Sequence, residues 1–486
     1  MSNLSELLPS GGGQNVVEFT ADGAISSGAA VALQTDGTVT PVTETNFAQS
    51  IETATSFNSS SAGFLSGIYE PVNNKLVIAY ADGSNSNYAT AVVGTVSDGS
   101  ISFGTPTVFN SGYGYIYGIN SDTAGKVFIS FRDTLNNNWG TGIVGTISGT
   151  SISFGSKSTF NTTNTLTLGT VAQYPTGGKL VLFYQYSGST SLRGVVVTIS
   201  GTSFSLGSDV QLSNGGNSGL SAAYDSANDK IVLAFTTSTS TGAAKVVSIS
   251  GTSISSGVEV VFDSTTGIGY IACAYHTAEQ KTAIAYTDGS GGNGTVVLGT
   301  VSGTSISFGT ASTYNTGDTY GSSVNYHTAS ERLVFFFRDN ANFGRIKVMS
   351  ATVSGNTFTF TAELTVLTSG YGTVTSGYGI AYDPDTEQSV LVYSDSGNSY
   401  RGTVNIYNVP STTTNVSDFI GLAADAISDT ASGDINVKGG INEAQTGLTI
   451  GSDYYVQDDG TLSTTSSSVK VGQAITATTI NMMDLT

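Results

Sequence analysis

The stretch SGTSISFG, at Ser148 to Gly155, decides the fold because it returns along the chain at an almost constant interval. Variants of it begin at Ser97 (SDGSISFG), Ser200 (SGTSFSLG), Ser250 (SGTSISSG), Ser302 (SGTSISFG) and Ser354 (SGNTFTFT). The turn glycines stand at 99, 149, 201, 251, 303 and 355, so the steps are 50, 52, 50, 52 and 52 residues. A fixed period of this size predicts a repeat architecture.

Each repeat contains four short segments typical of β-strands. Before the phrase at Ser302 the chain reads GYIACAY, KTAIAYTD and GTVVLGTV, bounded by polar or glycine-rich turns. Alternating β-branched and aromatic residues between such turns predict strands, and no window shows a helical period. The second segment opens with a basic residue in six repeats: Lys75, Lys126, Lys179, Lys230, Lys281 and Arg332. Tandem four-stranded units of this length predict an all-β chain containing a β-propeller.

The ends of the array predict seven blades. A last repeat runs from about Tyr371 to Pro410 and lacks its fourth strand. Residues 49–58 (QSIETATSFN) align with the fourth strands at 101–110 and 152–161. We therefore expect this N-terminal strand to complete the last four-stranded blade, which leaves no open sheet edge.

Composition excludes several classes of function. With 16 Lys plus Arg against 35 Asp plus Glu, the net charge of −19 argues against nucleic-acid binding, which needs a basic surface. The single cysteine, Cys273, lies in the apolar segment IACAY and is expected to be a buried structural thiol, so no disulfide framework exists. Apolar runs are too short for a signal peptide or a transmembrane helix, so we expect neither Sec export nor membrane insertion.

The flanks of the array predict a second domain. Residues 1–14 are expected to form a flexible N-terminal arm that can dock on a neighbour. Residues 15–49 and 410–486 are rich in strands and Asp-Gly turns and do not match the blade repeat. Because ring closure brings residues 50 and 409 together, we expect one split β-domain with the propeller, 50–409, inserted into it.

These flanks resemble bacteriophage virion proteins of the fibre, spike and decoration families. The resemblance is carried by ADGAISSGAAVALQTDGTVTPV on one side and by FIGLAADAISDTASGDINV with TGLTIGSDYYVQDDGTLSTT on the other. It implies a small β-domain that anchors to other virion proteins, commonly as a homotrimer, and displays an exposed module. It implies location at the virion surface, does not distinguish head from tail, and brings no catalytic residue.

Blade geometry predicts which face of the propeller is displayed. If the first strand of each blade is innermost, the loops between strands two and three and between blades share one face, opposite the ends of the array. These loops carry aromatic residues, Asn, Ser, Gly and a few Arg, a composition suited to a glycan or protein receptor. Packing of the same side chains onto the blades is the alternative. The candidate residues are Tyr88, Tyr113, Tyr115, Tyr117, Arg132, Trp139, Tyr320, Arg338, Phe343, Tyr371, Tyr378, Tyr400 and Arg401.

Signals for catalysis or cofactors are weak. His276 and His327 occupy the same repeat position, which favours a shared role in a turn. Asp82, Asp133, Asp288, Asp339 and Asp395 each end a second strand, which favours turn capping. No carboxylate pair of the glycosidase type stands out, and DGSNSN, DGSGGNG and DSGNSY do not match a calcium loop. We expect no enzyme activity, no cofactor and no metal site, with calcium in a loop left open.

The sequence therefore predicts a phage virion structural protein that displays a propeller from the particle, as a fibre or spike for host recognition. The first alternative is a capsid or tail decoration protein with a purely structural role. A glycan-cleaving enzyme is the second. The sequence does not identify the receptor or the host.

Overall fold

The computed structural model describes residues 15–162, 165–187, 191–367 and 378–482. These residues form β-strands and short 3-10 turns, η2 (Gly83–Asn85), η4 (Ser396–Asn398) and η5 (Val416–Asp418), with no α-helix. Within the described ranges, none of the helical turns has the length and apolar character to span a membrane. The chain divides into two compact units: Gln49–Val409, here called the propeller, and the flanking residues up to Ala48 and from Pro410, here called the base. The division lies one residue from the expected boundary.

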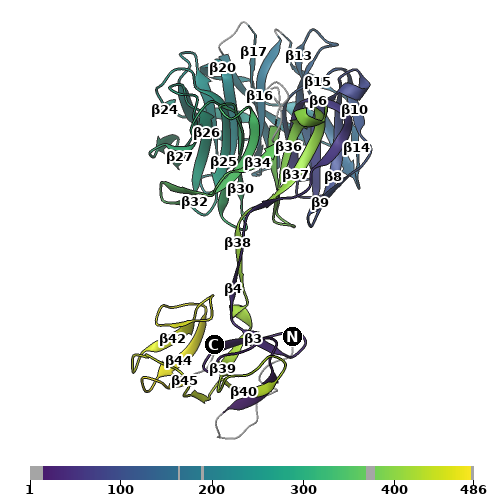
Figure 1. Cartoon of the computed structure of the whole chain (residues 1–486). Helices are drawn as coiled ribbons and strands as arrows, with labels where there is room; N and C mark the ends of the chain where they lie inside the picture. The colour runs from purple at the N-terminus through teal and green to yellow at the C-terminus, as the bar shows by residue number, and fades with distance from the viewer. Residues whose placement is uncertain (1–14, 163–164, 188–190, 368–377, 483–486) are drawn as a thin grey trace. The chain divides into compact units, whose positions relative to one another are not determined.

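The propeller consists of repeated four-stranded antiparallel sheets, its blades (Figure 1). Every blade has the strand order one, two, three, four, as expected from the sequence. The first strands are β6 (Thr55–Glu70), β11 (Tyr115–Ser121), β16 (Leu166–Tyr174), β20 (Val210–Asp225), β25 (Gly269–His276), β30 (Thr319–His327) and β35 (Tyr378–Asp383). The second strands are β7 (Lys75–Asp82), β12 (Lys126–Asp133), β17 (Lys179–Tyr186), β21 (Lys230–Thr237), β26 (Lys281–Thr287), β31 (Arg332–Asp339) and β36 (Gln388–Asp395).

The third and fourth strands complete each blade. The third strands are β8 (Tyr88–Ser97), β13 (Trp139–Ser148), β18 (Ser191–Ser200), β22 (Gly242–Ser250), β27 (Gly294–Ser302), β32 (Arg345–Ser354) and β37 (Arg401–Asn408). The fourth strand is interrupted and comes in two pieces, both paired with the third strand. These pieces are β9 (Ser100–Phe103) and β10 (Thr107–Tyr113), β14 (Ser151–Phe154) and β15 (Ser158–Asn161), β19 (Ser203–Leu206) and the start of β20, β23 (Ser253–Ser256) and β24 (Val260–Asp263), β28 (Ser305–Phe308) and β29 (Ser312–Asn315), β33 (Thr357–Phe360) and β34 (Leu364–Leu367), and β5 (Ser50–Ile51) and the start of β6.

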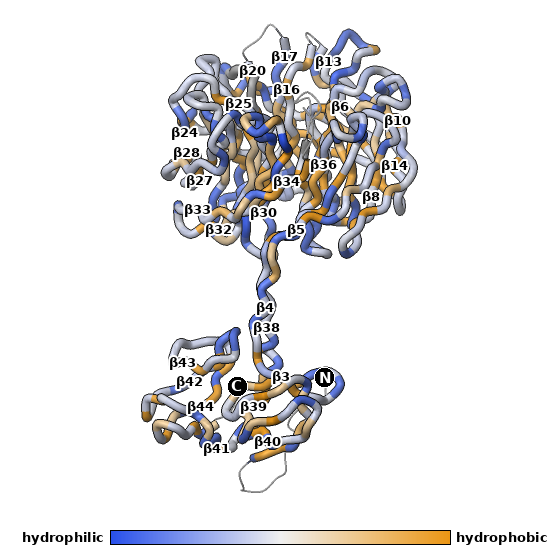
Figure 2. The backbone as a smooth tube through the Cα atoms, in the orientation of Figure 1, coloured by the Kyte–Doolittle hydropathy of each residue, from blue (hydrophilic) through white to orange (hydrophobic). Residues whose placement is uncertain are grey.

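The pairings of β6 close the ring as the sequence predicted. Its first part pairs with β37, the third strand of the last blade, and its second part pairs with β7. The first strands contact one another in the closed order β6, β11, β16, β20, β25, β30, β35 and back to β6. The first strand is therefore innermost, as expected. Apolar clusters fill the spaces between successive blades, and the strands carry most of the hydrophobic residues while the loops are hydrophilic (Figure 2).

The repeated phrase is explained by its two glycines. In SGTSISFG the pair Ser148 and Ser151 closes a two-residue hairpin whose first central residue, Gly149, has φ +60°, a conformation that favours glycine. At the end of the phrase, a Cβ on Gly155 would lie 1.8 Å from the carbonyl oxygen of Thr202, in the same turn of the next blade. Neighbouring blades therefore interlock through the last glycine of one phrase and the threonine of the next.

The base contains two sheets. Half-domain A is made of β1 (Val16–Thr20), β2 (Ala30–Leu33), β3 (Val39–Pro41), β39 (Phe419–Ala423) and β40 (Ser432–Val437), in the order β1-β40-β39-β2-β3. Half-domain B is made of β41 (Ile441–Asn442), β42 (Asp453–Val456), β43 (Leu462–Ser463), β44 (Val469–Ala474) and β45 (Ile480–Met482), in the order β41-β45-β44-β42-β43.

Half-domains A and B have the same topology and register, so the base is an internal duplication. Gly28 donates its N–H to Ala423 at 3.0 Å, and Gly451 donates to Ala474 at 2.8 Å. Both halves close their first hairpin with an Asp-Gly-Thr turn in which the aspartate accepts from the threonine. The equivalent positions in A and B are Gly28 and Gly451, Ala30 and Asp453, Asp36 and Asp459, Leu422 and Gln473, Ala423 and Ala474, and Asn436 and Asn481.

The duplication shows where the propeller entered. In half-domain B the chain passes from β43 to β44 through residues 464–468. At the same place in half-domain A the chain leaves β3, forms β4 (Glu44–Phe47), builds the whole propeller and returns through β38 (Ser411–Thr414). Strands β4 and β38 pair antiparallel over their full length, and all eight side chains are exposed.

Candidate functional site

The face of the propeller opposite its chain ends, here called the loop face, carries the loops between strands two and three and those between blades. Chain direction in β37 places Val409 away from this face, and Tyr407 donates to Gln49 at 2.6 Å beside it. The loop face is thus the one on which the sequence predicted a binding surface.

Three predicted residues, Tyr113, Tyr115 and Arg132, form one cluster on this face together with Phe64. We call it the first aromatic cluster. The ring of Tyr115 lies 4.6 Å from that of Tyr113 and 4.6 Å from that of Phe64. The guanidinium carbon of Arg132 lies 3.4 Å above the Tyr115 ring, in cation–π contact. Burial and the neighbouring Tyr115 raise the pKa of Tyr113. The cluster offers aromatic rings beside a planar cation.

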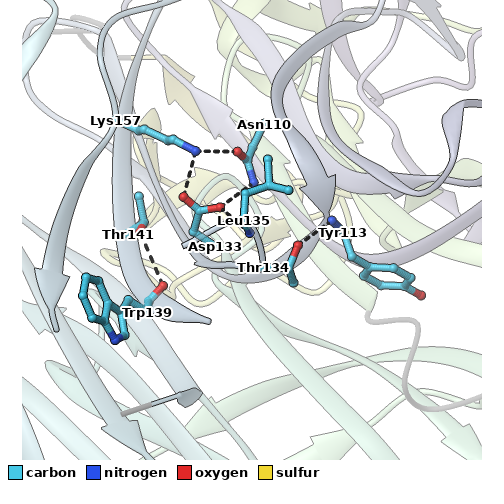
Figure 3. A network of polar contacts seen from close by, with 8 residues as sticks. All are labelled: Asn110, Tyr113, Asp133, Thr134, Leu135, Trp139, Thr141 and Lys157. Atoms are coloured by element: carbon cyan, nitrogen blue, oxygen red, sulfur yellow. Dashed lines mark hydrogen bonds and ion pairs between the residues drawn. The ribbon is translucent and has the colours of Figure 1, made fainter. Parts of the chain in front are cut away.

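The charge of Arg132 is not neutralised within the described ranges. No carboxylate there forms an ion pair with it, and its Nε is buried without a hydrogen-bond partner. The adjacent Asp133 is fully buried and engaged elsewhere, because it accepts from Lys157 at 2.7 Å and from Asn110 at 3.1 Å (Figure 3). Within the described ranges, Arg132 is therefore held by its cation–π contact with Tyr115 and not by an ion pair.

An equivalent cluster of Tyr270, Tyr320 and Arg338 lies between two other blades. Tyr115 pairs with Arg132 across β11 and β12, and Tyr320 pairs with Arg338 across β30 and β31 in the same way. The Tyr270 and Tyr320 rings are 5.0 Å apart, and the Arg338 guanidinium lies 5.8 Å from Tyr320. Arg338 is only 6% exposed and donates to Asn340, so this predicted residue is buried under its own loop and is not an open contact.

The loops between strands two and three place large side chains in an unfavourable backbone conformation. Four of these loops end in two consecutive residues with positive φ, which in two blades are Ser86 with Asn87 and Asn137 with Asn138. Asparagine tolerates this region well. In two other blades the positions hold Phe343, at φ +59° and 77% exposed, and Tyr400, at φ +59° and 40% exposed. Neither residue is explained by packing or by backbone preference.

The other predicted residues are spread around the face. Tyr88, Trp139 and Arg401 each begin a third strand directly after such a loop and are half-buried. Tyr117 packs between two blades and donates to the carbonyl of Leu166, which favours the packing alternative for this residue. Tyr378 begins β35, and Tyr371 lies outside the described residues.

Sequence reasoning missed Phe64 and Tyr270. Each follows a glycine at the bulge of a first strand and has positive φ, +48° and +51°. The pairs Gly63-Phe64 and Gly269-Tyr270 occupy the same repeat position. An alignment of the repeats position by position, rather than a scan of loops for aromatic residues, contained that signal.

The predicted turn roles are confirmed by the hydrogen bonds. The five repeated aspartates all accept from backbone N–H groups of their own loops: Asp82, Asp133, Asp288, Asp339 and Asp395. His276 and His327 accept at Nδ1 from the backbone of Glu279 and Ser330, both at 3.2 Å. Burial lowers the pKa of both imidazoles.

Cys273 corrects one expectation, because the residue is half-buried rather than fully buried. Its thiol nonetheless lies in apolar surroundings, and burial raises its pKa to about 12. It lines a cavity of about 440 Å³ inside the ring of first strands, together with Tyr224, Tyr275 and Tyr326. Tyr224 donates to Asp229 within its own hairpin, and Tyr275 accepts from Ala227 of the preceding blade, so Tyr275 joins two hairpins at the face opposite the loop face. Within the described ranges, no group of three His, Cys, Asp or Glu residues is placed to hold a metal ion.

Comparison with known proteins identifies no family. No protein-family model and no curated protein matches the chain. Among solved structures, the chain is similar to a six-bladed fucose-recognising lectin from Aleuria aurantia, with 11% identity, a TM-score of 0.41, and coverage of 63% of this chain and 96% of the lectin. A protein of unknown function from Dyadobacter fermentans shows 10% identity, a TM-score of 0.44, and coverage of 75% and 99%. At these values the likeness carries no argument about blade number or ligand.

Proposed function

We propose that this chain is a non-enzymatic surface-recognition protein of a bacteriophage virion, a fibre or spike whose propeller binds a receptor on the host surface. The propeller is assigned seven blades, from the first strands that follow one another around its ring. The base is the part that anchors to other virion proteins at the particle surface and joins copies into a homotrimer. The virion assignment rests on the resemblance of the flanks.

The observation that carries the recognition role is the pair Phe343 and Tyr400. Large aromatic side chains stand exposed on the loop face, at backbone positions that favour asparagine or glycine. Strained backbone conformations of this kind cluster at functional sites, where the side chain contacts a ligand or partner. The exposed aromatic residues lie on the same face as Arg132, and this supports the proposal that the loop face is the binding surface.

The chemistry of the face favours a glycan. Aromatic rings pack against the apolar faces of sugar rings, while a guanidinium donates several hydrogen bonds to hydroxyl or carboxylate oxygens. In the first aromatic cluster, Tyr115 and Arg132 present both features side by side. Asp133, which is buried and paired with the partly exposed Lys157, accepts from the backbone of Leu135 and holds the loop that follows Arg132 in place.

Two substitutions test the role. Tyr115→Ala removes the central ring of the first cluster, and Arg132→Lys keeps the charge but removes the planar donor group. Adsorption of virions, or of the purified chain, to host cells and to an array of host glycans is compared with that of Val72→Ala. Val72 is also exposed but lies in a hairpin on the opposite face. Binding that is unchanged in both cluster variants contradicts the proposal.

A structural decoration protein is the second candidate, favoured by the observation that Tyr117 and Arg338 are used for packing. Electron microscopy of virions with and without the propeller separates the two roles. Density at the tail or fibres with loss of adsorption supports recognition, whereas density over the capsid with unchanged adsorption supports decoration. Release of sugar from host polysaccharide by the purified chain would instead favour a glycan-cleaving enzyme.

A further inference from the structure

Three arginines on the loop face have no ionic partner within the described ranges. Arg132 is the last residue but one of β12, and Arg345 and Arg401 are the first residues of β32 and β37. None of the three side chains forms an ion pair or a hydrogen bond in those ranges, and the Nε of each is buried without a partner. The chain has 35 Asp plus Glu against 16 Lys plus Arg, so these guanidinium groups are unpaired in spite of an acidic composition.

The carboxylate nearest to each arginine along the strands is used by the propeller itself. Each arginine has one of the repeated aspartates as its neighbour, either in the chain or across the strand pair. All three of these aspartates accept from backbone N–H groups of their own loops. Asp133 and Asp339 are 0% and 5% exposed, and each also binds a lysine at 2.7 Å. This part of the loop face therefore carries guanidinium donors, while the neighbouring carboxylates are engaged within the fold.

Each of the three arginines also lies beside an aromatic side chain on the loop face. In two blades the aromatic residue precedes the arginine in the same loop and is exposed. In the third, Arg132 stacks on Tyr115, whose ring contacts that of Phe64. We call this set the basic arc, and its members are Phe64, Tyr115, Arg132, Phe343, Arg345, Tyr400 and Arg401.

The basic arc extends over four successive blades. Its residues come from the blades whose first strands are β30, β35, β6 and β11, and these strands contact one another in that order. Elsewhere on the ring the chemistry differs: the loop 238–241, in the blade of β20, reads STST, and Arg193, in the blade of β16, is paired with Asp209 at 2.6 Å. Because the arginine and aromatic pairs recur from blade to blade, the basic arc suits an extended ligand with repeating chemistry.

We propose that the loop face binds an acidic polysaccharide along the basic arc. Carboxylates of its sugar residues accept from Arg132, Arg345 and Arg401, because a planar guanidinium matches a carboxylate in a bidentate hydrogen bond. The sugar rings between them pack on the aromatic side chains. A neutral sugar needs acceptors for its hydroxyl hydrogens, and the repeated aspartates are already engaged. The inference rests on the proposed function for the location of the site, and it adds the class and the extent of the ligand.

The net charge of the chain makes this binding selective. At −19 the chain repels anionic polymers at a distance, so retention by non-specific attraction is not expected. Binding depends on the contacts at the arc, and several weak contacts along one polymer reinforce one another through their effective concentration. Affinity should therefore rise with polymer length until the polymer covers the arc.

Binding of the purified full chain to immobilised polygalacturonate, hyaluronate and polysialate tests the ligand class. We expect the chain to bind at least one of these polymers, and to bind the carboxyl-reduced form of that polymer about tenfold more weakly or worse. Dextran, a neutral polymer, and single-stranded DNA, a polyanion without sugar carboxylates, are the controls. The inference is overturned if none of the three acidic polymers binds, or if the carboxyl-reduced form, dextran or DNA binds equally well.

Substitutions and polymer length test the site. Arg345→Gln and Arg401→Gln should each weaken polymer binding about tenfold, and Arg401→Lys, which keeps the charge, should retain part of the affinity and decides the matter if the glutamine variant does not fold. Arg332→Gln is the matched control, because it removes the same charge at the start of β31, on the opposite face. Equal losses in the control and the arc variants, or no loss in either arc variant, overturn the inference. A monomeric sugar acid that binds as tightly as the polymer overturns the extended site.

The result can be separated from that of the receptor proposal. If host adsorption falls in Tyr115→Ala but is indifferent to Arg345→Gln and to carboxyl reduction of the host glycans, the acidic ligand is overturned and the receptor role stands. If the chain binds an acidic polymer through the arc but does not adsorb to host cells, the receptor role is overturned and this inference stands.

Discussion

Replacement of Phe343 by asparagine is expected to stabilise the propeller slightly while weakening receptor binding. Phe343 has φ +59°, and the left-handed region costs an ordinary residue about 1–2 kcal/mol, much of which asparagine avoids. Against this gain stands the lost packing of a side chain that is 77% exposed, roughly a quarter of the 1.5–3 kcal/mol of full burial, or about 0.5 kcal/mol. The net expectation is a gain of about 0.5–1 kcal/mol.

Two assays on the same preparation check this prediction. Thermal unfolding should show an unchanged or slightly higher midpoint, by about 1 °C for a unit of this size. Binding to host cells should weaken about tenfold, equivalent to about 1.4 kcal/mol for one lost aromatic contact. Val72→Asn, at an exposed position on the opposite face, should leave binding unchanged. A variant that is destabilised by more than about 1 kcal/mol would show that Phe343 serves the fold, and the argument from strain would fail.

Three further outcomes follow from the fold. Gly155→Ala should lower the midpoint of thermal unfolding by several degrees more than Gly149→Ala, because its Cβ meets the Thr202 carbonyl at 1.8 Å while Gly149 faces open space; equal effects would contradict the interlocking of blades. Stability should fall as the pH drops below about 6.5, because burial lowers the pKa of His276 and His327 in the folded state and the unfolded chain then binds more protons; the double variant to Gln, followed by thermal unfolding from pH 7 to 5.5, should lose part of that slope. Replacing residues 43–415 by the sequence of 464–468 should leave a folded base, because half-domain B makes the same connection with that loop; loss of dispersed amide signals in an NMR spectrum of the product would show that the propeller is needed for base folding.

Much of the propeller could be predicted because each blade repeats the same two backbone positions that require glycine. The two-residue hairpin of SGTSISFG requires a glycine at φ near +60°, and the close approach to the next blade requires another at the end of the phrase. Both needs recur in every interlocked blade, so they leave a period in the sequence. Closure by the N-terminal strand was predictable for the same reason, since residues 49–58 carry the pattern of a fourth strand.

The duplication in the base is less visible in the sequence than the repetition of the blades. Half-domains A and B share TDGT at 35–38 and DDGT at 458–461, yet half-domain A is divided by the whole propeller. Tight hairpins and bulges fix the register in both halves, but the side chains on equivalent strands differ, as with Ala30 and Asp453. The register became visible only through the strand pairings.

The candidate site was predicted from the residue types in the loops, which do not show which side chains contact one another. Aromatic residues in loops predicted a binding face, which stays a prediction. They did not distinguish Tyr115, in contact with Arg132, from Tyr117, which packs between blades. Tyr117 is the extra residue of a bulge in β11, which interrupts the alternation of side chains along the strand. Tyr115 therefore contacts Phe64 of the preceding blade, whereas Tyr117 contacts Leu166 of the following blade. Phe64, contributed by the preceding blade, could not be assigned from loop composition.

The two strands β4 and β38 give the propeller two covalent attachments to the base. Their four-residue ladder has every side chain exposed and no core on either side, so we expect it to be the part of the described chain most open to proteases. A cut in one strand does not free the propeller, because the other strand still carries it and β6 keeps the ring closed. Release takes two cuts, so at low extents of proteolysis the fraction of propellers lost from the base rises with the square of the cleaved fraction of each strand and not in proportion to it.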